Sequence, residues 1–331
     1  MGRDRRIVGR IAPSPSGLMH LGNAFSALLA WAFARSENGE FVVRLENLDE
    51  RCQNPAYVKG VLDDLRWLGI EWDGEPFVQT ERVAAYEVAL GHIADKAELY
   101  PCFCSRADLH AASAPHASDG TPLYAGTCFS MDPDERDALA LERRHALRLH
   151  VPDETISFVD AIQGPYAQNL ASECGDFVLR RSDGVFAYQL VCVVDDIAQG
   201  VTQVVRGSDL LSSTPRQALL YRLLDAPVPK FAHHPLLLAP DGRRLSKRDG
   251  DSTIAGMRAR GVAPEAIVGY LAYLAGQVEV GESMGAPELL DIFDASKIPR
   301  EDIRVASNYP LAMTARIGII ALASFQRPTG I

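Results

Sequence analysis

The hydrophobic pattern of the first fifty residues predicts a strand, a helix and a second strand. Residues Ile7–Ala12 form a short apolar run, and Pro13–Gly17 directly after them interrupt any strand. Ala24–Arg35 is rich in helix-forming residues and stops before Asn38, and Phe41–Leu45 is apolar again. A strand, a helix and a strand in so short a stretch indicate an α/β protein with a parallel sheet.

Two further helices follow, and then the character of the chain changes. Apolar residues at helical spacing predict helices over Tyr57–Leu68 and Glu81–Ala97. From Tyr100 to about Asp176 the chain carries clustered cysteines, a polar helix over Pro133–Arg144 and two alternating segments, Ala146–Val151 and Thr155–Val159. We interpret this stretch as an insertion into the α/β domain.

Apolar runs after the insertion predict that the first sheet resumes. The expected strands are Phe177–Leu179, Ala187–Val194, Thr202–Arg206 and Pro235–Leu238. A helix is expected over Thr214–Leu224, with Ser213 or Thr214 as its cap, and Pro264–Leu274 is the clearest helix of the remaining segment. Beyond Pro299 no periodicity lasts more than one turn.

Composition places the chain among globular proteins. It has 331 residues, of which 47% are hydrophobic and 23% charged, and it contains no run of 18 apolar residues and no signal-type segment. Six scattered cysteines do not make a disulfide scaffold and suit a reducing compartment. We therefore expect a monomeric cytoplasmic protein that does not bind membranes.

The charge balance restricts how the chain can bind nucleic acid. A net charge of −10 argues against binding that depends on wholesale neutralisation of phosphates, but it leaves room for a local basic patch. Two candidate patches are Arg143–Arg144 together with Arg148, and Arg180–Arg181.

Two segments carry candidate phosphate chemistry, although the commoner phosphate-loop and dinucleotide signatures are absent. In Arg10–Asn23, His20 and Gly22 stand just before a helix, where an imidazole donor and free backbone N–H groups would stabilise an anion. In Asp241–Gly250, several cations including Lys247 surround one serine between two glycines, as a mobile grip on a polyphosphate requires. Alternatively, the first segment is a turn with a capping histidine and the second a solvated charged turn.

Taken together, these segments resemble the two ATP signatures, HIGH and KMSKS, of class I aminoacyl-tRNA synthetases. The matching residues are His20–Asn23 and Arg244–Arg248. Further segments are similar to the glutamyl branch of that class, and the resemblance spans about Ile7–Leu290: they are Arg10–Gly17, Arg44–Asp49, Val193–Asp196 and Val205–Leu211. Asn47, where aspartate is more usual, and the arginines that begin and end the lysine loop depart from the family pattern.

Within that branch, the length of the chain after the lysine loop favours the shorter glutamyl-Q tRNA(Asp) synthetase family. Only 84 residues follow Lys247, which is enough for a small helical domain but not for a long anticodon-binding region. The resemblance implies activation of L-glutamate with ATP and Mg²⁺ in the absence of tRNA, followed by transfer to the queuosine base in the anticodon loop of tRNA(Asp). The alternatives are charging of a tRNA 3′ end, a non-catalytic paralogue that binds glutamate or tRNA, and another adenylyl transferase.

The resemblance also implies a fold and a domain organisation. We expect a Rossmann-like α/β class I catalytic domain with an inserted zinc-binding subdomain and a small helical C-terminal domain. Residues 1–100 and 177–250 would be the two halves of the catalytic domain, 101–176 the inserted subdomain, and 251–331 the C-terminal domain.

Site roles follow from the resemblance, residue by residue. Arg10 and Arg206 would read the side-chain carboxylate of glutamate, and Glu46 would receive its ammonium group. Ser14 and Tyr188 would complete the hydrogen bonding. The residues expected at ATP are His20, Gly22, Asn23, Ser246 and Lys247, with His20 and Lys247 as the catalytic pair. The residues themselves also allow a surface ion pair between Arg10 and Glu46 and a core position for Tyr188.

Three clustered cysteines, Cys102, Cys104 and Cys128, suggest a metal site in the insertion. Thiolates are preferred zinc ligands, and His110 or His116 would be an ordinary fourth ligand, whereas three reduced buried thiols are an equally simple interpretation. The family resemblance implies zinc held by Cys, Cys, Tyr and Cys, which adds Tyr124. We take His233 and His234 as structural, with one of them facing the nucleotide, and Asp195–Asp196 as either the floor of the site or the end of a strand.

Overall fold

Parallel strands form the centre of the computed structural model, which describes residues 6–105, 108, 123–243, 245 and 253–305. Strands β1 (Val8–Ile11), β2 (Glu40–Leu45) and β3 (Phe77–Val78) pair in parallel, as do β9 (Gln203–Gly207) and β10 (Lys230–His234). The two groups meet where the Thr202 amide donates to the Val8 carbonyl. The order is therefore β3-β2-β1-β9-β10, as in a doubly wound domain.

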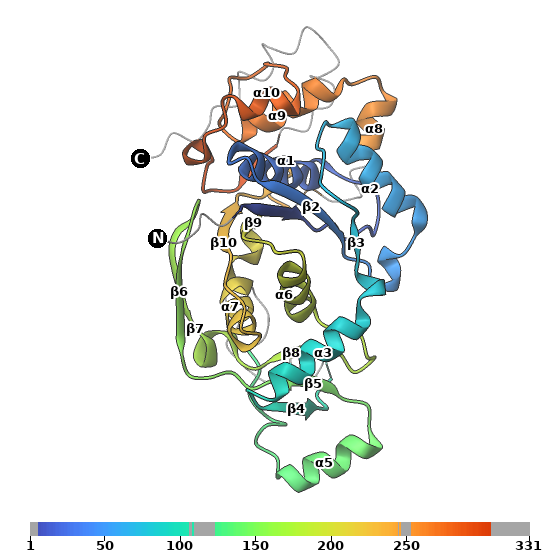
Figure 1. The fold of residues 1–331 in the computed structure, drawn as a ribbon, viewed down its shortest axis with the longest axis vertical. Coiled ribbons are helices and arrows are strands. Elements are labelled where there is room, and N and C mark those ends of the chain that lie inside the picture. The colour runs from blue at the N-terminus through green and yellow to red at the C-terminus, as the bar shows by residue number, and fades with distance from the viewer. Residues whose placement is uncertain (1–5, 106–107, 109–122, 244, 246–252, 306–331) are drawn as a thin grey trace.

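Helices cover both faces of this sheet (Figure 1). Helix α1 (Leu21–Ser36) packs on one face together with α9 (Pro264–Leu274) and α10 (Ala286–Leu290), and α6 (Tyr188–Ala198) and α7 (Thr214–Leu223) lie on the other with α3 (Val83–Ala94). Neighbouring residues on a strand serve opposite faces, since Val204 belongs to the second core and Val205 to the first. The expected α/β architecture, a parallel sheet with helices on both faces, is present.

The insertion forms a separate antiparallel sheet. Strands β4 (Leu99–Cys102), β5 (Ala146–Leu149) and β8 (Phe177–Arg180) pair in that order, with α5 (Pro133–Glu142) beyond them at the bottom of Figure 1. A long hairpin of β6 (Thr155–Asp160) and β7 (Gly164–Asn169) runs back along the molecule to the central sheet. β8 thus pairs with a strand of the insertion and not with the central sheet. The boundaries expected for the two catalytic halves, the inserted subdomain and the C-terminal domain stay predictions.

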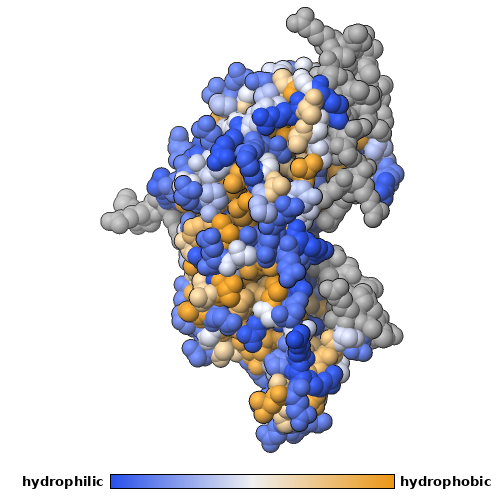
Figure 2. Space-filling model, turned by 90° about the vertical axis from the view of Figure 1, so that its right-hand side faces the viewer, coloured by the Kyte–Doolittle hydropathy of each residue, from blue (hydrophilic) through white to orange (hydrophobic). Residues whose placement is uncertain are grey.

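The last described segment returns to the central domain. Helix α2 (Pro55–Trp67) packs against α8 (Ile254–Ala259), and β12 (Ile303–Arg304) pairs in parallel with β11 (Leu237–Leu238). None of the helices in the described part of the chain has both the length and the apolar composition that a membrane span requires. Figure 2 shows hydrophilic side chains spread over one face of the molecule, with apolar ones between them.

Most helices and strands predicted from the sequence are confirmed, but Ala187–Val194 is not a strand. These residues belong to the loop before α6 and to α6 itself, where every side chain from Leu190 to Asp196 is buried. The run from Leu190 to Val194 is apolar and rich in valine, and five such residues imitate a buried strand in the sequence. The predicted strand Pro235–Leu238 is also displaced, because the main strand ends at His234 and only Leu237–Leu238 follow.

Candidate active site

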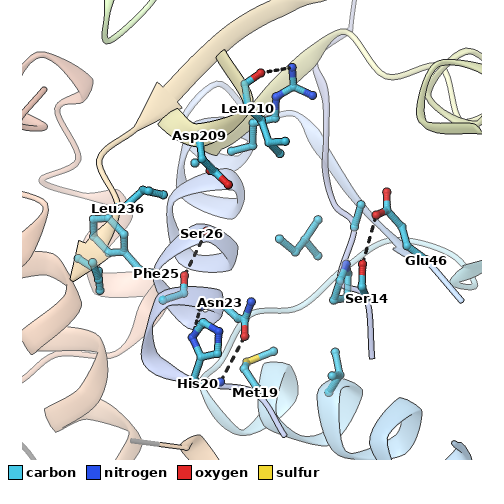
Figure 3. Close-up of a pocket in the computed structure, with 18 of the residues that line it drawn as sticks. Ser14, Met19, His20, Asn23, Phe25, Ser26, Glu46, Asp209, Leu210 and Leu236 are labelled. Carbon is cyan, nitrogen blue, oxygen red and sulfur yellow. Dashed lines mark hydrogen bonds between the residues drawn. The ribbon is translucent and has the colours of Figure 1, made fainter. Parts of the chain in front are cut away.

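A cavity of about 570 Å³ opens at the carboxyl ends of β1, β2 and β9, beside the start of α1 (Figure 3). Open α/β sheets bind their ligands at this edge, where the strand order reverses. Every predicted glutamate- or ATP-binding residue in the described part of the chain lines this cavity: Arg10, Ser14, His20, Gly22, Asn23, Glu46, Tyr188 and Arg206.

His20 begins helix α1 and lies in a reciprocal cap with Asn23 (Figure 3). The His20 Nδ1 accepts the Asn23 backbone N–H at 3.3 Å, and the Asn23 Oδ1 accepts the His20 backbone N–H at 3.3 Å. Because Nδ1 is an acceptor, the neutral ring carries its proton on Nε2. Gly22 keeps this arrangement open, since a Cβ there would lie 3.2 Å from the His20 ring, a contact to which the ring would have to yield. The capping interpretation of His20 is therefore correct.

The lysine loop leaves and re-enters the described structure next to His20. Leu245 lines the cavity, and Thr253 forms a bridge with His20 while the Ile254 amide donates to the Met19 carbonyl at 2.9 Å. Ser246 and Lys247 themselves lie outside the described residues. Two segments more than two hundred residues apart in the sequence thus meet at one cavity.

Arg10 is a buried residue with a buried carboxylate partner, and not part of a surface pair. Its Nε lies 3.4 Å from the Asp196 carboxylate, its Nη1 donates to the Val205 carbonyl at 3.2 Å, and only 3% of the residue is exposed. Arg44, also buried, donates to the same Asp196 oxygen at 2.6 Å. Burial alone would raise the pKa of Asp196, but these two guanidinium groups hold it below its ordinary value.

Glu46 lies between this buried network and the cavity. One of its oxygens is 3.5 Å from Arg44 Nη2, and the other accepts from the Ser14 hydroxyl at 3.4 Å (Figure 3). Burial raises the pKa of Glu46, and Arg44 and Arg10 offset part of that rise. A cationic group entering the cavity would stabilise the ionised carboxylate further.

Arg206 and Tyr188 lie together on the opposite wall of the cavity. The Arg206 Nη1 is 3.5 Å from the Tyr188 hydroxyl, and its other donors are held by buried acceptors of β10, η4 (Ser208–Ser213) and α7. Burial raises the pKa of Tyr188, so its hydroxyl stays protonated near neutral pH. Arg10 and Arg206 therefore present two cations to one cavity that also contains Glu46.

Sequence reasoning missed several residues that hold this site. Arg44 sits in an apolar strand, and its contacts with Asp195 and Asp196 cross about 150 positions of sequence. Asp195 accepts from Gln79, Arg82 and Tyr86, and Asp196 binds Arg10 and Arg44, so the two aspartates lie within helix α6 and hold these side chains without lining the cavity themselves. His234 lines the cavity as expected for one of the two histidines, whereas His233 lies below it.

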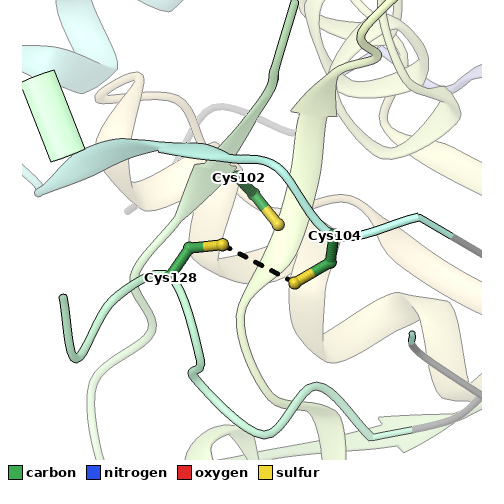
Figure 4. Close-up of side chains that lie close together, drawn as sticks. All are labelled: Cys102, Cys104 and Cys128. Atoms are coloured by element: carbon green, nitrogen blue, oxygen red, sulfur yellow. Dashed lines mark hydrogen bonds between the residues drawn. The ribbon is translucent and has the colours of Figure 1, made fainter. Parts of the chain in front are cut away.

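The three cysteines of the insertion converge (Figure 4). The sulfur atoms of Cys102, Cys104 and Cys128 all lie within 4.8 Å of one another, with 3.6 Å between those of Cys104 and Cys128. The Tyr124 hydroxyl is 3.7 Å from the Cys102 sulfur and accepts the Cys128 backbone N–H at 2.7 Å. His110 and His116 lie outside the described residues.

These spacings fit a four-coordinate metal. Ligands about 2.3 Å from a tetrahedral zinc ion are about 3.8 Å from one another, close to the observed separations. Burial raises the pKa of the Cys104 thiol to about 12, so a bound cation is needed to keep this residue as a thiolate. The three cysteines could therefore hold a metal ion.

One predicted basic patch is wrong in part. Arg148 is buried, stacks over the Tyr124 ring at 4.0 Å from its centre, and donates to the Asp176 carbonyl at 2.7 Å. Arg143 and Arg144 are exposed, Arg180 is half-buried beside Glu87, and Arg181 is exposed and paired with Asp183. Arg148 therefore supports the cysteine cluster and offers no surface charge.

The fold and this cavity define a nucleotide-binding synthetase domain, and comparison with known proteins identifies its family. A family model for tRNA synthetases class I (E and Q), catalytic domain, matches residues 6–299. The chain therefore belongs to the class I tRNA synthetases of the E and Q group.

Individual proteins of this family are similar to the chain over most of its length. The chain is 48% identical to a glutamyl-Q tRNA(Asp) synthetase of Symbiobacterium thermophilum, over 93% of this chain and 98% of that protein. It is 44% identical to one of Nocardia farcinica, over 88% and 91%. A crystal structure of a glutamate tRNA ligase from Elizabethkingia meningosepticum in complex with its amino acid is similar with a TM-score of 0.78 and 27% identity, over 93% of this chain and 68% of that chain.

Proposed function

We propose that this protein activates L-glutamate with ATP and transfers it to the queuosine base in the anticodon loop of tRNA(Asp). The observation that carries the proposal is the cavity where His20, Arg10, Glu46 and Arg206 converge, in a chain 48% identical over most of its length to a glutamyl-Q tRNA(Asp) synthetase. The reaction is that of a ligase: ATP is cleaved to AMP and pyrophosphate while the ester between glutamate and the tRNA forms.

Glutamate matches the charges around the cavity. The substrate carries two carboxylates and one ammonium group, and the lining of the cavity includes two buried arginines, Arg10 and Arg206, and the carboxylates of Glu46 and Asp209. In our proposal Arg10 and Arg206 bind the side-chain carboxylate, Glu46 binds the ammonium group, and Ser14 and Tyr188 supply neutral hydrogen bonds. Glutamine would leave one guanidinium without an anion, which supports selection of the acid over the amide.

Adenylate formation needs positioning rather than a protein nucleophile. The α-carboxylate of glutamate attacks the α-phosphorus of ATP, and pyrophosphate leaves with its bonding electrons. His20, Gly22 and Asn23 at the start of α1 would bind phosphate oxygens, and Ser246 and Lys247 would reach the same triphosphate from the lysine loop. Mg²⁺ bound to ATP would share the growing charge on the leaving group.

Zinc is proposed as a structural ion of the insertion. Cys102, Cys104, Cys128 and Tyr124 would hold it, and their separations support this assignment. The ion would fix β4 to the loop around Tyr124. It would lie at the end of β4, outside the cavity, and would take no part in the chemistry there.

The partner is tRNA(Asp) carrying queuosine, and the reaction belongs in the cytoplasm. A hydroxyl group of the modified base accepts the glutamyl group. It attacks the carbonyl carbon of the glutamyl adenylate, and AMP leaves. Because the chain is acidic overall, tRNA binding would depend on local cations such as Arg143 and Arg144 and would weaken steeply with salt.

Glutamate-dependent exchange of pyrophosphate into ATP tests the first half of the proposal. Exchange in the absence of tRNA, dependent on glutamate and not supported by glutamine or aspartate, is the expected result. Exchange with another amino acid, or none without tRNA, would contradict it. Transfer of labelled glutamate to tRNA(Asp) with queuosine, but not to the same tRNA with guanosine in its place, tests the second half.

A further inference from the structure

Arg206 is held by an unusually complete set of neutral acceptors. Nε donates to His233 Nε2 at 3.0 Å, Nη1 to Gln217 Oε1 at 2.8 Å, and Nη2 to both the Thr214 hydroxyl at 2.8 Å and the Leu210 carbonyl at 3.2 Å. A guanidinium group has five N–H donors. Among the described residues, the fifth N–H, on Nη1, reaches only the Tyr188 hydroxyl at 3.5 Å, at the wall of the cavity.

None of these acceptors carries a charge. Arg10, by contrast, lies 3.4 Å from the carboxylate of Asp196, which neutralises part of its charge. Among the described residues, Arg206 has no carboxylate within ion-pair distance. It is connected to the Asp160 carboxylate only through the ring of His233. Its positive charge is therefore left for an anion in the cavity.

His233 can act as an acceptor because Asp160 fixes its tautomer. The His233 Nδ1 lies 2.6 Å from Asp160 Oδ2, and neither side chain is exposed to solvent. An ionised carboxylate accepts only, so the proton is on Nδ1 and the lone pair of Nε2 faces Arg206. Burial and the neighbouring Arg206 lower the pKa of His233, although Asp160 opposes them, which keeps the ring neutral at neutral pH.

Asp160 is itself held in place by the backbone. Its Oδ1 accepts the amides of Ile162 at 3.0 Å, Gln163 at 2.9 Å and His233 at 3.0 Å. Although burial would raise the pKa of Asp160, the bond from His233 and these amides hold it below its ordinary value. Asp160, the last residue of β6 before the turn to β7, is thus an anion that the backbone holds in a fixed position.

We infer that Asp160 and His233 are positioning residues for recognition of an acidic amino acid. Through His233 Nε2 they fix the plane of the Arg206 guanidinium group. Its one remaining N–H and its positive charge then face the side-chain carboxylate of the bound glutamate, beside Tyr188. This inference rests on the proposed function, because it assumes that Arg206 binds glutamate. It assigns the long hairpin of the insertion a role in substrate selection.

Two substitutions of His233 separate positioning from simple packing. Glutamine places a carbonyl oxygen near the position of Nε2, whereas leucine fills the space and accepts nothing. His233→Leu is expected to raise the KM for glutamate at least tenfold in pyrophosphate exchange, with the KM for ATP within about twofold of the wild type. His233→Gln should recover most of that loss. His92→Leu, at an exposed position of α3, is the matched control and should match the wild type.

The outcomes decide between the inference and its alternatives. An unchanged KM for glutamate in His233→Leu, or equal increases for glutamate and ATP with no recovery in His233→Gln, would overturn it. If His233→Leu does not fold, Asp160→Asn carries the test: a raised KM for glutamate alone supports the inference, and an unchanged one overturns it. Wild-type protein without glutamate-dependent exchange would instead refute the proposed function.

Discussion

At the scale of single residues, the candidate site depends on buried charges that compensate one another. Asp196 is 2% exposed and lies beneath the cavity, with Arg44 and Arg10 on one side and the Tyr221 hydroxyl at 3.1 Å on the other. Breaking one partner of such a group leaves an unpaired buried charge, which is far more costly than losing a surface pair. The cations that face the substrate are thus rigid before it binds.

Lys247→Ala tests whether the lysine loop acts on the triphosphate. Loss of one preorganised cation near the developing charge is expected to lower the rate of adenylate formation by on the order of 10²-fold, measured by pyrophosphate exchange. Lys59→Ala, on the exposed face of α2, is the control and should retain the wild-type rate. A Lys247→Ala rate equal to the wild type would remove this residue from the mechanism.

His234 predicts a pH dependence of stability. Burial lowers the pKa of His234 to about 4, from 6.5, so the unfolded chain binds this proton first as the pH falls. The neutral His234 side chain contributes fully to the free energy of unfolding above about pH 6.5. This contribution falls as the pH is lowered from there to about 4, and about 2 kcal/mol of it is lost by pH 5.

Urea unfolding at pH 7 and pH 5 measures that loss. The wild type should lose about 2 kcal/mol more unfolding free energy over this interval than His234→Gln, which cannot titrate. His92→Gln, exposed on α3, should behave as the wild type. Equal losses in the wild type and His234→Gln would show that His234 titrates normally.

The sequence predicted individual residues well where local spacing carries the signal. His20, Gly22 and Asn23 are neighbours, and a cap needs only its own turn of helix. Pairings between distant segments left no such signal, so the link from Asp160 to Arg206 through His233 could not be predicted. Arg148 was misjudged for the same reason, because only the fold places the Tyr124 ring over it.

At the scale of elements, most helices and strands were predictable, including the largely buried α1 and β2, whereas the valine-rich helix α6 and the two-residue strands were not. α9 spans Pro264–Leu274 as predicted, and α2, predicted over Tyr57–Leu68, begins two residues earlier and ends one residue earlier, at Pro55 and Trp67. α6 was taken for a strand because Leu190–Val194 is a continuous apolar run rich in β-branched valine. β12 has two residues, too few for any period, and exists only through its pairing with β11.

β12 and the residue before it connect the C-terminal segment to the cavity. Asp302 Oδ1 accepts the Leu236 amide at 2.8 Å and the Ser208 hydroxyl at 3.3 Å, and Leu236 lines the cavity beside the strand that precedes the lysine loop. Asp302→Ala should therefore raise the KM for ATP about five- to tenfold in pyrophosphate exchange, with the KM for glutamate unchanged.

Asparagine at the same position is the matched control, because it keeps the Oδ1 acceptor. Asp302→Asn should lie within about twofold of the wild type. Equal damage by alanine and asparagine would mean that the charge matters and not the acceptor. An unchanged KM for ATP in Asp302→Ala would separate β12 from nucleotide binding.

The cysteine cluster predicts one zinc ion per chain. Purified protein should contain stoichiometric zinc, and Cys104→Ala should lose it, because a three-ligand remnant no longer closes a tetrahedral site. Cys174→Ala removes a buried cysteine outside the cluster and should keep the metal. Elemental analysis provides the measurement. Wild-type protein without zinc, or Cys104→Ala with full zinc, would contradict the assignment.

At the scale of the whole molecule, one edge of the central sheet serves every proposed step. The start of α1, the ends of β1, β2 and β9, and both ends of the lysine loop meet there, while the insertion extends away from it (Figure 1). A net charge of −10 means that the tRNA cannot be held by a general positive field. Binding measured at increasing salt should weaken with a slope set by a small number of phosphate contacts.

The site of glutamate attachment tests the central claim most directly. Labelled glutamate is transferred to tRNA(Asp) containing queuosine, and the product is digested with a nuclease that separates the anticodon-loop fragment from the 3′-terminal adenosine. The account predicts that the label stays with the anticodon-loop fragment and is lost on mild alkaline hydrolysis of the ester. Label released with the terminal adenosine would contradict it and would make the protein a tRNA-charging enzyme.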